Sequence, residues 1–69
     1  MTGYNEMTFL NCRGERICAR AGSYAETVLT AKVMASMGWN LSQSQLVIPG
    51  VMSADNTETV HSLVEESLS

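Results

Sequence analysis

The chain has 69 residues, of which 45% are apolar and 16% charged, and its formal net charge is −3. This length allows a single domain over residues 1–69, and the balance of apolar and charged residues is that of a folded chain. The negative charge argues against nonspecific binding to nucleic acid or to anionic membranes, because both need basic patches.

The sequence holds no apolar run of the ~18 residues that a membrane-spanning helix needs. Its first residues also lack the basic and apolar regions of a signal peptide. We therefore expect a cytoplasmic protein that does not associate with a membrane. In that compartment Cys12 and Cys18 are expected to be reduced thiols.

The first predicted element is a β-hairpin formed by residues 7–12 and 16–20. Both runs contain apolar residues, and Gly14 lies in the three-residue turn between them. Two such runs joined by a short glycine-containing loop are typical of a hairpin. The second run alternates polar and apolar residues, which predicts a sheet with one face in water. Arg16, Cys18 and Arg20 face one way, and Ile17 and Ala19 face the other.

A helix is predicted over residues 24–37. Ser23 and Glu26 have the spacing of a capping box, in which each side chain satisfies a free backbone N–H group. No proline or glycine interrupts the segment, and Gly38 follows it where a helix end favours a left-handed residue. Two apolar stripes run along this helix, so we expect it to be covered on two sides. The stripes consist of Tyr24, Val28, Ala31 and Ala35, and of Leu29, Val33 and Met37.

The second half of the chain is predicted to hold one short strand and one helix. The sequence of residues 39–44 indicates a connection. Residues 45–48 are mostly apolar and end at Pro49, which indicates an edge strand or an extended segment. Residues 55–58 place acidic side chains at a helix start, and apolar residues then recur at helical spacing at positions 60, 63, 64 and 68. The predicted fold is a small α+β domain with the element order β-β-α-β-α.

Two cysteines and one histidine are the residues best suited to chemistry, and they match no catalytic or metal-binding motif. Cys12 and Cys18 would face each other if three residues close the hairpin, which leaves a disulfide or half of a metal site open. A structural zinc site needs four ligands, and with His61 the chain offers three. We interpret the cysteines as small, partly buried side chains and His61 as exposed on the polar face of the last helix. The chain is predicted to be no enzyme and to bind no metal or cofactor.

Fixed charges are distributed unevenly along the chain. No lysine or arginine follows Lys32, and the last predicted helix with its cap carries Asp55, Glu58, Glu65 and Glu66. Complementary charge steers association, so this acidic face is a candidate contact for a protein with a basic surface. A second candidate surface is apolar and consists of Leu29, Val33, Met37 and Trp39. The small core and the apolar central helix also favour a homodimer.

The function that these observations favour is non-enzymatic binding to another protein, as a stoichiometric regulator or inhibitor of a larger complex. One concrete form of this hypothesis is an inhibitor from a mobile element that blocks the basic nucleic-acid groove of a host-defence complex. The alternative is a dimeric DNA-binding transcriptional regulator. It would contact DNA through the basic hairpin, with Arg13, Arg16 and Arg20.

Overall fold

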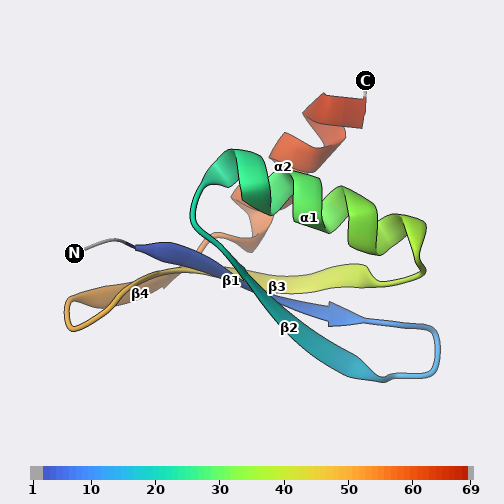
Figure 1. The fold of residues 1–69 in the computed structure, drawn as a ribbon, viewed down its shortest axis with the longest axis horizontal. Helices are drawn as coiled ribbons and strands as arrows, with labels where there is room; N and C mark the ends of the chain where they lie inside the picture. The colour runs from blue at the N-terminus through green and yellow to red at the C-terminus, as the bar shows by residue number, and fades with distance from the viewer. Residues whose placement is uncertain (1–2, 69) are drawn as a thin grey trace.

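The computed structural model describes residues 3–68, which form a four-stranded antiparallel sheet with two helices on one of its faces (Figure 1). The strands lie side by side in the order β2-β1-β3-β4. The predicted α+β class is confirmed, and the element order gains one strand to become β-β-α-β-β-α. The elements are β1 (Tyr4–Leu10), β2 (Arg16–Ala21), α1 (Tyr24–Ser36), β3 (Asn40–Ile48), β4 (Met52–Asp55) and α2 (Thr57–Leu68).

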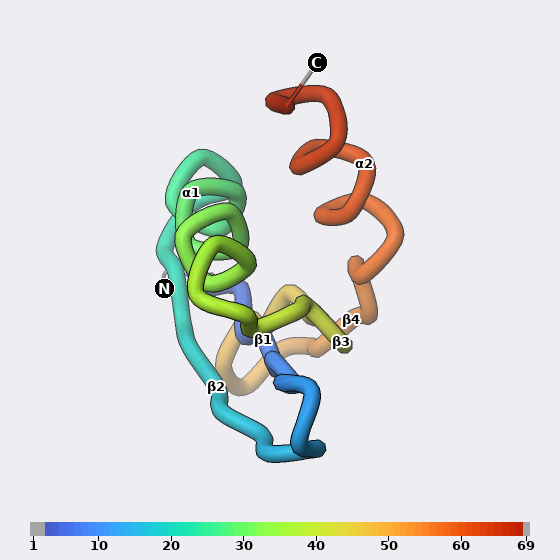
Figure 2. The backbone as a smooth tube through the Cα atoms, turned by 90° about the vertical axis from the view of Figure 1, so that its right-hand side faces the viewer, coloured from blue at the N-terminus to red at the C-terminus, as the bar shows by residue number. Residues whose placement is uncertain are grey.

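The chain consists of two successive ββα units, residues 4–36 and 40–68. In each unit an antiparallel hairpin is followed by a helix, and the two units join where β1 pairs with β3 in the middle of the sheet. Figure 2 shows α1 above the β1–β2 side of the sheet and α2 above the β3–β4 side. Within residues 3–68, no helix lies on the opposite face of the sheet.

The first hairpin forms as predicted, but its strands and loop have different bounds. The first strand begins at Tyr4 and ends at Leu10, so residues 11–15 form the loop. Asn11 organises that loop: its Oδ1 accepts hydrogen bonds from the backbone N–H groups of Arg13 (3.0 Å) and Glu15 (2.9 Å). Gly14 has a φ of 78°, a conformation that favours glycine. A five-residue loop stabilised by the Asn11 side chain is therefore found in place of the predicted three-residue turn.

The predicted caps of α1 are confirmed. The Ser23 hydroxyl accepts a hydrogen bond from the Glu26 N–H (3.2 Å), and Glu26 Oε2 accepts one from the Gly22 N–H (3.2 Å). At the other end Gly38 has a φ of 88°. Its N–H donates to Ala35 and that of Trp39 donates to Met34, which is the bonding of a Schellman motif. Local signals alone therefore fix both ends of this helix.

The prediction for residues 39–48 was wrong in two respects. Residues 40–44 belong to β3 rather than to a connection, and β3 is internal because β4, which was not predicted, pairs with it. Pro49 lies outside the strand, so its missing N–H does not confine β3 to an edge. Pro49 and Gly50, whose φ is 75°, occupy the middle of a turn closed by a hydrogen bond from the Val51 N–H to the Ile48 carbonyl (2.9 Å).

The core lies between the sheet and α1. Met7 and Phe9 of β1 are fully buried there, and Ala31 of α1 packs with them. The side of α1 that is most buried carries Thr27 and Ala31, so only Ala31 of the two predicted apolar stripes is among the buried residues. Large side chains from the sheet meet small ones from the helix, which lets α1 approach the sheet closely. The partly buried side chains around this cluster are Ala19, Met34, Trp39, Leu41 and Val64.

Helix α2 is held at its first turn by hydrogen bonds to β3. Thr57 Oγ1 accepts from the Ser44 N–H (2.9 Å) and donates to the Ser44 carbonyl (3.1 Å). Asn56 Nδ2 donates to Asn5 Oδ1 (2.7 Å) and to the Tyr24 hydroxyl (3.2 Å), which connects the starts of the two helices. Within residues 3–68, no helix is both long enough and apolar enough to cross a membrane.

Candidate protein-binding site

Four carboxylates form the acidic face, which we define as Asp55, Glu58, Glu65 and Glu66. All four side chains are exposed. Asp55 lies one residue before the N-cap position of α2, and its side chain caps the first turn, since its Oδ1 accepts a hydrogen bond from the Thr57 N–H (3.0 Å). The backbone and side-chain hydrogen bonds from Thr57 lower the pKa of Asp55 below its ordinary value of 3.8, so this carboxylate is charged at neutral pH. The acidic face therefore presents charge to solvent beside a helix.

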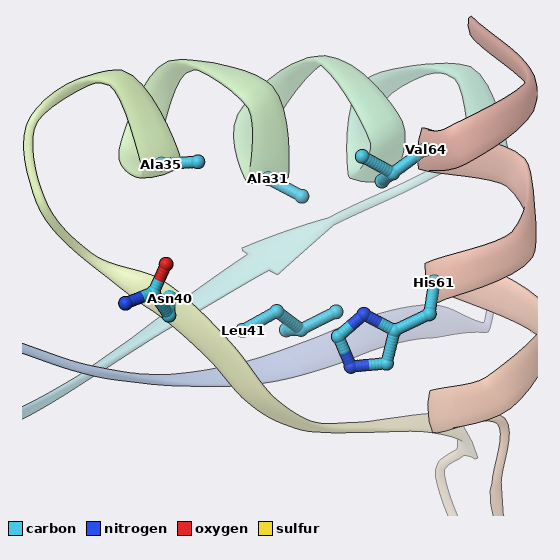
Figure 3. A pocket seen from close by; sticks show the side chains of 6 residues that line it. All are labelled: Ala31, Ala35, Asn40, Leu41, His61 and Val64. Carbon is cyan, nitrogen blue, oxygen red and sulfur yellow. The ribbon is translucent and has the colours of Figure 1, made fainter. Parts of the chain in front are cut away.

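A hollow of about 160 Å³ lies beside this face, between α1, β3 and α2. Figure 3 shows the His61 ring extending from α2 toward Leu41 on β3, while Ala31 and Ala35 lie on the side of α1 that faces the hollow. The predicted exposure of His61 is confirmed, and its place at the hollow is new. The six residues that line the hollow are Ala31, Ala35, Asn40, Leu41, His61 and Val64.

His61 is the residue that joins the hollow to the acidic face. It follows Glu58 by three positions and precedes Glu65 by four. Residues at these spacings are neighbours on one side of a helix. The rim of the hollow along α2 is therefore acidic, whereas its walls are mostly apolar.

The basic hairpin was the alternative contact surface, and most of its charge is balanced within the chain. Arg13 pairs with Glu15 and Arg20 with Glu6, each at 3.4 Å. Arg20 also stacks on the Tyr4 ring, with 4.7 Å between the guanidinium carbon and the ring centre. Among the residues that the structure describes, Arg16 has no ion-pair partner. Carboxylates beside two of the three arginines weaken the attraction of this surface for phosphates.

The predicted apolar surface separates into two parts. Leu29, Val33 and Met37 are 62%, 48% and 61% exposed, and we call these three residues the outer stripe of α1. Trp39 is half-buried and packs against the core cluster, so it does not belong to that stripe. Three large apolar side chains of α1 therefore face solvent, whereas Ala31 and Met34 pack in or against the core.

The two cysteines lie in different places and are both exposed. Cys18 lies on β2 opposite Thr8, and Cys12 lies in the hairpin loop, so they do not face each other. Both are free thiols, and the expectation that they are partly buried was wrong. Cys12 lies in an exposed loop, and Cys18 lies on an edge strand, on the sheet face that the helices do not cover. Among residues 3–68, no group of three or more His, Cys, Asp or Glu side chains is arranged to hold a metal ion.

No family model, curated protein or solved structure matches this chain. The chemistry of its surfaces is thus what can indicate a function. The acidic face could be read directly from the sequence, but the hollow could not. The sequence does contain one local indication of the hollow, the small residues Ala31 and Ala35 one turn apart on α1. That they face His61 and Val64 depends on how the two helices pack, which spacing along the chain does not define.

Proposed function

We propose that this chain is a non-enzymatic cytoplasmic protein that binds a basic segment of another protein and thereby regulates or inhibits the complex to which that segment belongs. The observation that carries the proposal is the position of the hollow directly beside the acidic face. The carboxylates attract lysine and arginine side chains, and the hollow accepts one apolar side chain between them. The ligand is then a segment in which an apolar residue has basic neighbours.

The size of the hollow favours a side chain over a small-molecule substrate. Its volume of about 160 Å³ is below the roughly 300–1,000 Å³ of common ligand pockets. It is close to the roughly 150 Å³ of an apolar cavity that binds benzene. A phenyl or branched aliphatic group from a partner therefore matches the space between Ala35, Leu41 and Val64.

The charge of the acidic face supports a regulatory role. Exposed carboxylates add little to folding stability, but complementary charge accelerates association and makes its rate sensitive to salt. Proteins that handle nucleic acids concentrate lysine and arginine on their binding surfaces, because they must neutralise phosphates. An acidic protein bound to such a surface excludes the nucleic acid. Inhibition of a nucleic-acid-handling complex in host defence is the specific form of this proposal.

Charge reversal tests the acidic face. The protein is used as bait in the native host, and captured proteins are identified by mass spectrometry for the unsubstituted chain and for Glu66→Lys. Glu15→Lys is the matched control, because it changes the net charge equally in the β1–β2 loop. We expect a partner that Glu66→Lys loses and Glu15→Lys keeps. For the purified pair, Glu65→Lys with Glu66→Lys should leave the fold nearly unchanged and slow association at low salt.

Filling the hollow tests its role separately from charge. Ala35→Leu places a larger side chain in the hollow, whereas Ala25→Leu adds the same atoms to an exposed position elsewhere on α1. We expect Ala35→Leu to weaken binding of the captured partner and Ala25→Leu to leave it unchanged, with equal circular dichroism spectra. Association that is insensitive to salt, to Glu65→Lys with Glu66→Lys and to Ala35→Leu would refute the proposed docking site.

A further inference from the structure

The side of the sheet farthest from α2 ends in an unpaired strand edge. In the part of the chain that the structure describes, β2 is the outermost strand and pairs with β1 alone. It spans six residues, Arg16–Ala21, none of which is proline or glycine. A strand edge of this length presents backbone N–H and C=O groups to solvent and can pair with another strand in a register that keeps the charges of Arg16 and Arg20 out of directly opposite positions. The opposite edge strand, β4, has four residues and offers a shorter template.

The outer stripe of α1 lies on the same flank as this edge. Ala35 faces the hollow that α1 shares with α2, and Val33 and Met37 are each two residues away from it. Two residues correspond to about 160° around a helix, so the stripe points away from α2. Figure 2 places α1 above β2, with α2 on the other side. An apolar helix flank and an open strand edge, with Ile17 37% exposed on β2, therefore adjoin.

We infer that this flank is the contact between two copies of the chain, which pair their β2 strands antiparallel about a two-fold axis. Such pairing satisfies the strand edge of each copy with the strand edge of the other. It also places the two outer stripes against each other, because a two-fold contact uses the same patch on both copies. A second copy of the chain then covers both the β2 edge and the outer stripe of α1.

Charge complementarity selects the second copy and the register. Arg16 is the first residue of β2 and has no ion-pair partner among residues 3–68. The Glu26 carboxylate lies just beyond the other end of β2, where it accepts a hydrogen bond from the Gly22 N–H. Antiparallel pairing brings Arg16 of one copy to the strand end where Glu26 of the second copy lies. The Arg16 side chain starts from the open face of the sheet, as that of Cys18 does, so in the inferred dimer it reaches Glu26 around the end of the strand. A register centred on Ala19 sets Arg16 opposite Gly22. A register centred on Cys18 would set it opposite Arg20, and like charges in directly opposite positions are destabilising.

The inferred dimer does not depend on the proposed function, because the acidic face and the hollow lie on the other flank. Sedimentation equilibrium of the unsubstituted chain should show a dimer at micromolar concentration. Val33→Glu should weaken self-association by about 100-fold, because it buries an unpaired carboxylate in the contact. Val51→Glu is the matched control: this residue is 71% exposed at the β3–β4 turn, and its substitution should leave the dimer intact. Circular dichroism checks that both variants fold.

Chemical crosslinking tests the register without altering the apolar contact. With Ala19 on the axis, the two Cys18 residues are diagonal neighbours about 7–8 Å apart on the open face of the sheet. A short bis-maleimide should therefore link two copies of Cys12→Ser through Cys18 and should not link two copies of Cys18→Ser. A monomer at high micromolar concentration would overturn the inference. So would a dimer that crosslinks through Cys12 alone and tolerates Val33→Glu.

Discussion

The two ββα units share one arrangement but place their apolar side chains differently. The first supplies the core cluster of Met7, Phe9, Ala21 and Ala31, and α1 still keeps its outer stripe in solvent. In the second, α2 buries Val60, half-buries Val64 and leaves its carboxylates outside. α2 therefore has the ordinary pattern of a helix lying on a sheet. The outward apolar side chains of α1 are surplus to folding, so they are available for contact with another molecule.

The largest difference in the free energy of unfolding is expected between substitutions of a buried and of an exposed side chain within the first unit. Phe9→Ala should lower the free energy of unfolding by about 3–5 kcal/mol, because it leaves a cavity at a fully buried position. Leu29→Ala removes a side chain that is 62% exposed and should cost less than about 0.5 kcal/mol in the monomer. Urea denaturation at low protein concentration measures both. Equal losses would mean that the outer stripe contributes to the fold.

A smaller contrast separates the two threonines at the helix starts. Thr57→Val removes the acceptor of the Ser44 N–H, and that buried group is then left without a partner. This should cost about 1–3 kcal/mol. Thr27 Oγ1 donates to the Ser23 carbonyl (2.7 Å), which also accepts the Thr27 N–H (2.9 Å).

Thr27→Val therefore leaves no group unpaired at that carbonyl and should cost less than about 1 kcal/mol. Thermal unfolding measures the loss of stability in Thr57→Val and Thr27→Val, in which the same hydroxyl group is replaced by a methyl group. A loss of less than about 1 kcal/mol for Thr57→Val would show that α2 does not depend on its hydrogen bonds to β3.

Helices were predictable from this sequence because their signals are local. Ser23, Glu26 and Gly38 define the ends of α1 through contacts within a few residues. β4 and the first half of β3 were missed because few of their residues are apolar: residues 40–44 include one apolar residue, Leu41, and the fully buried position 44 is a serine. Polar side chains such as Gln43 and Ser53 then resemble those of a loop.

The orientation of α1 could not be derived from its own pattern. Two apolar stripes competed for the buried side, but Thr27 and Ala31 are the residues that the structure buries there. The reason lies in the sheet: Met7 and Phe9 fill the space beneath the helix and leave room for small side chains. Spacing along one helix cannot report the volume that another element supplies. The acidic face needed no such information, because charged residues at exposed helical positions remain at the surface in any packing.

The smallest expected contrast concerns how the two units cap their helices. α1 is capped by the neutral hydroxyl of Ser23, whereas α2 is capped by Asp55, whose pKa is lowered mainly by hydrogen bonds from Thr57. A carboxyl group whose pKa is lower in the folded state stabilises the fold above its unfolded pKa. That stabilisation is lost as the pH falls through the folded value.

The loss due to Asp55 should therefore begin near its ordinary pKa of 3.8 and continue below it. Asp55→Asn keeps a side-chain oxygen that can accept the Thr57 N–H, and it removes the titration because an amide does not ionise in this range. We expect its unfolding free energy to fall less steeply between about pH 5 and about pH 2 than that of the unsubstituted chain. Ser23→Asn should leave the steepness unchanged, because neither cap ionises. Urea midpoints across this range measure the slopes, and parallel curves for Asp55→Asn and the unsubstituted chain would show that the charge of Asp55 does not stabilise α2.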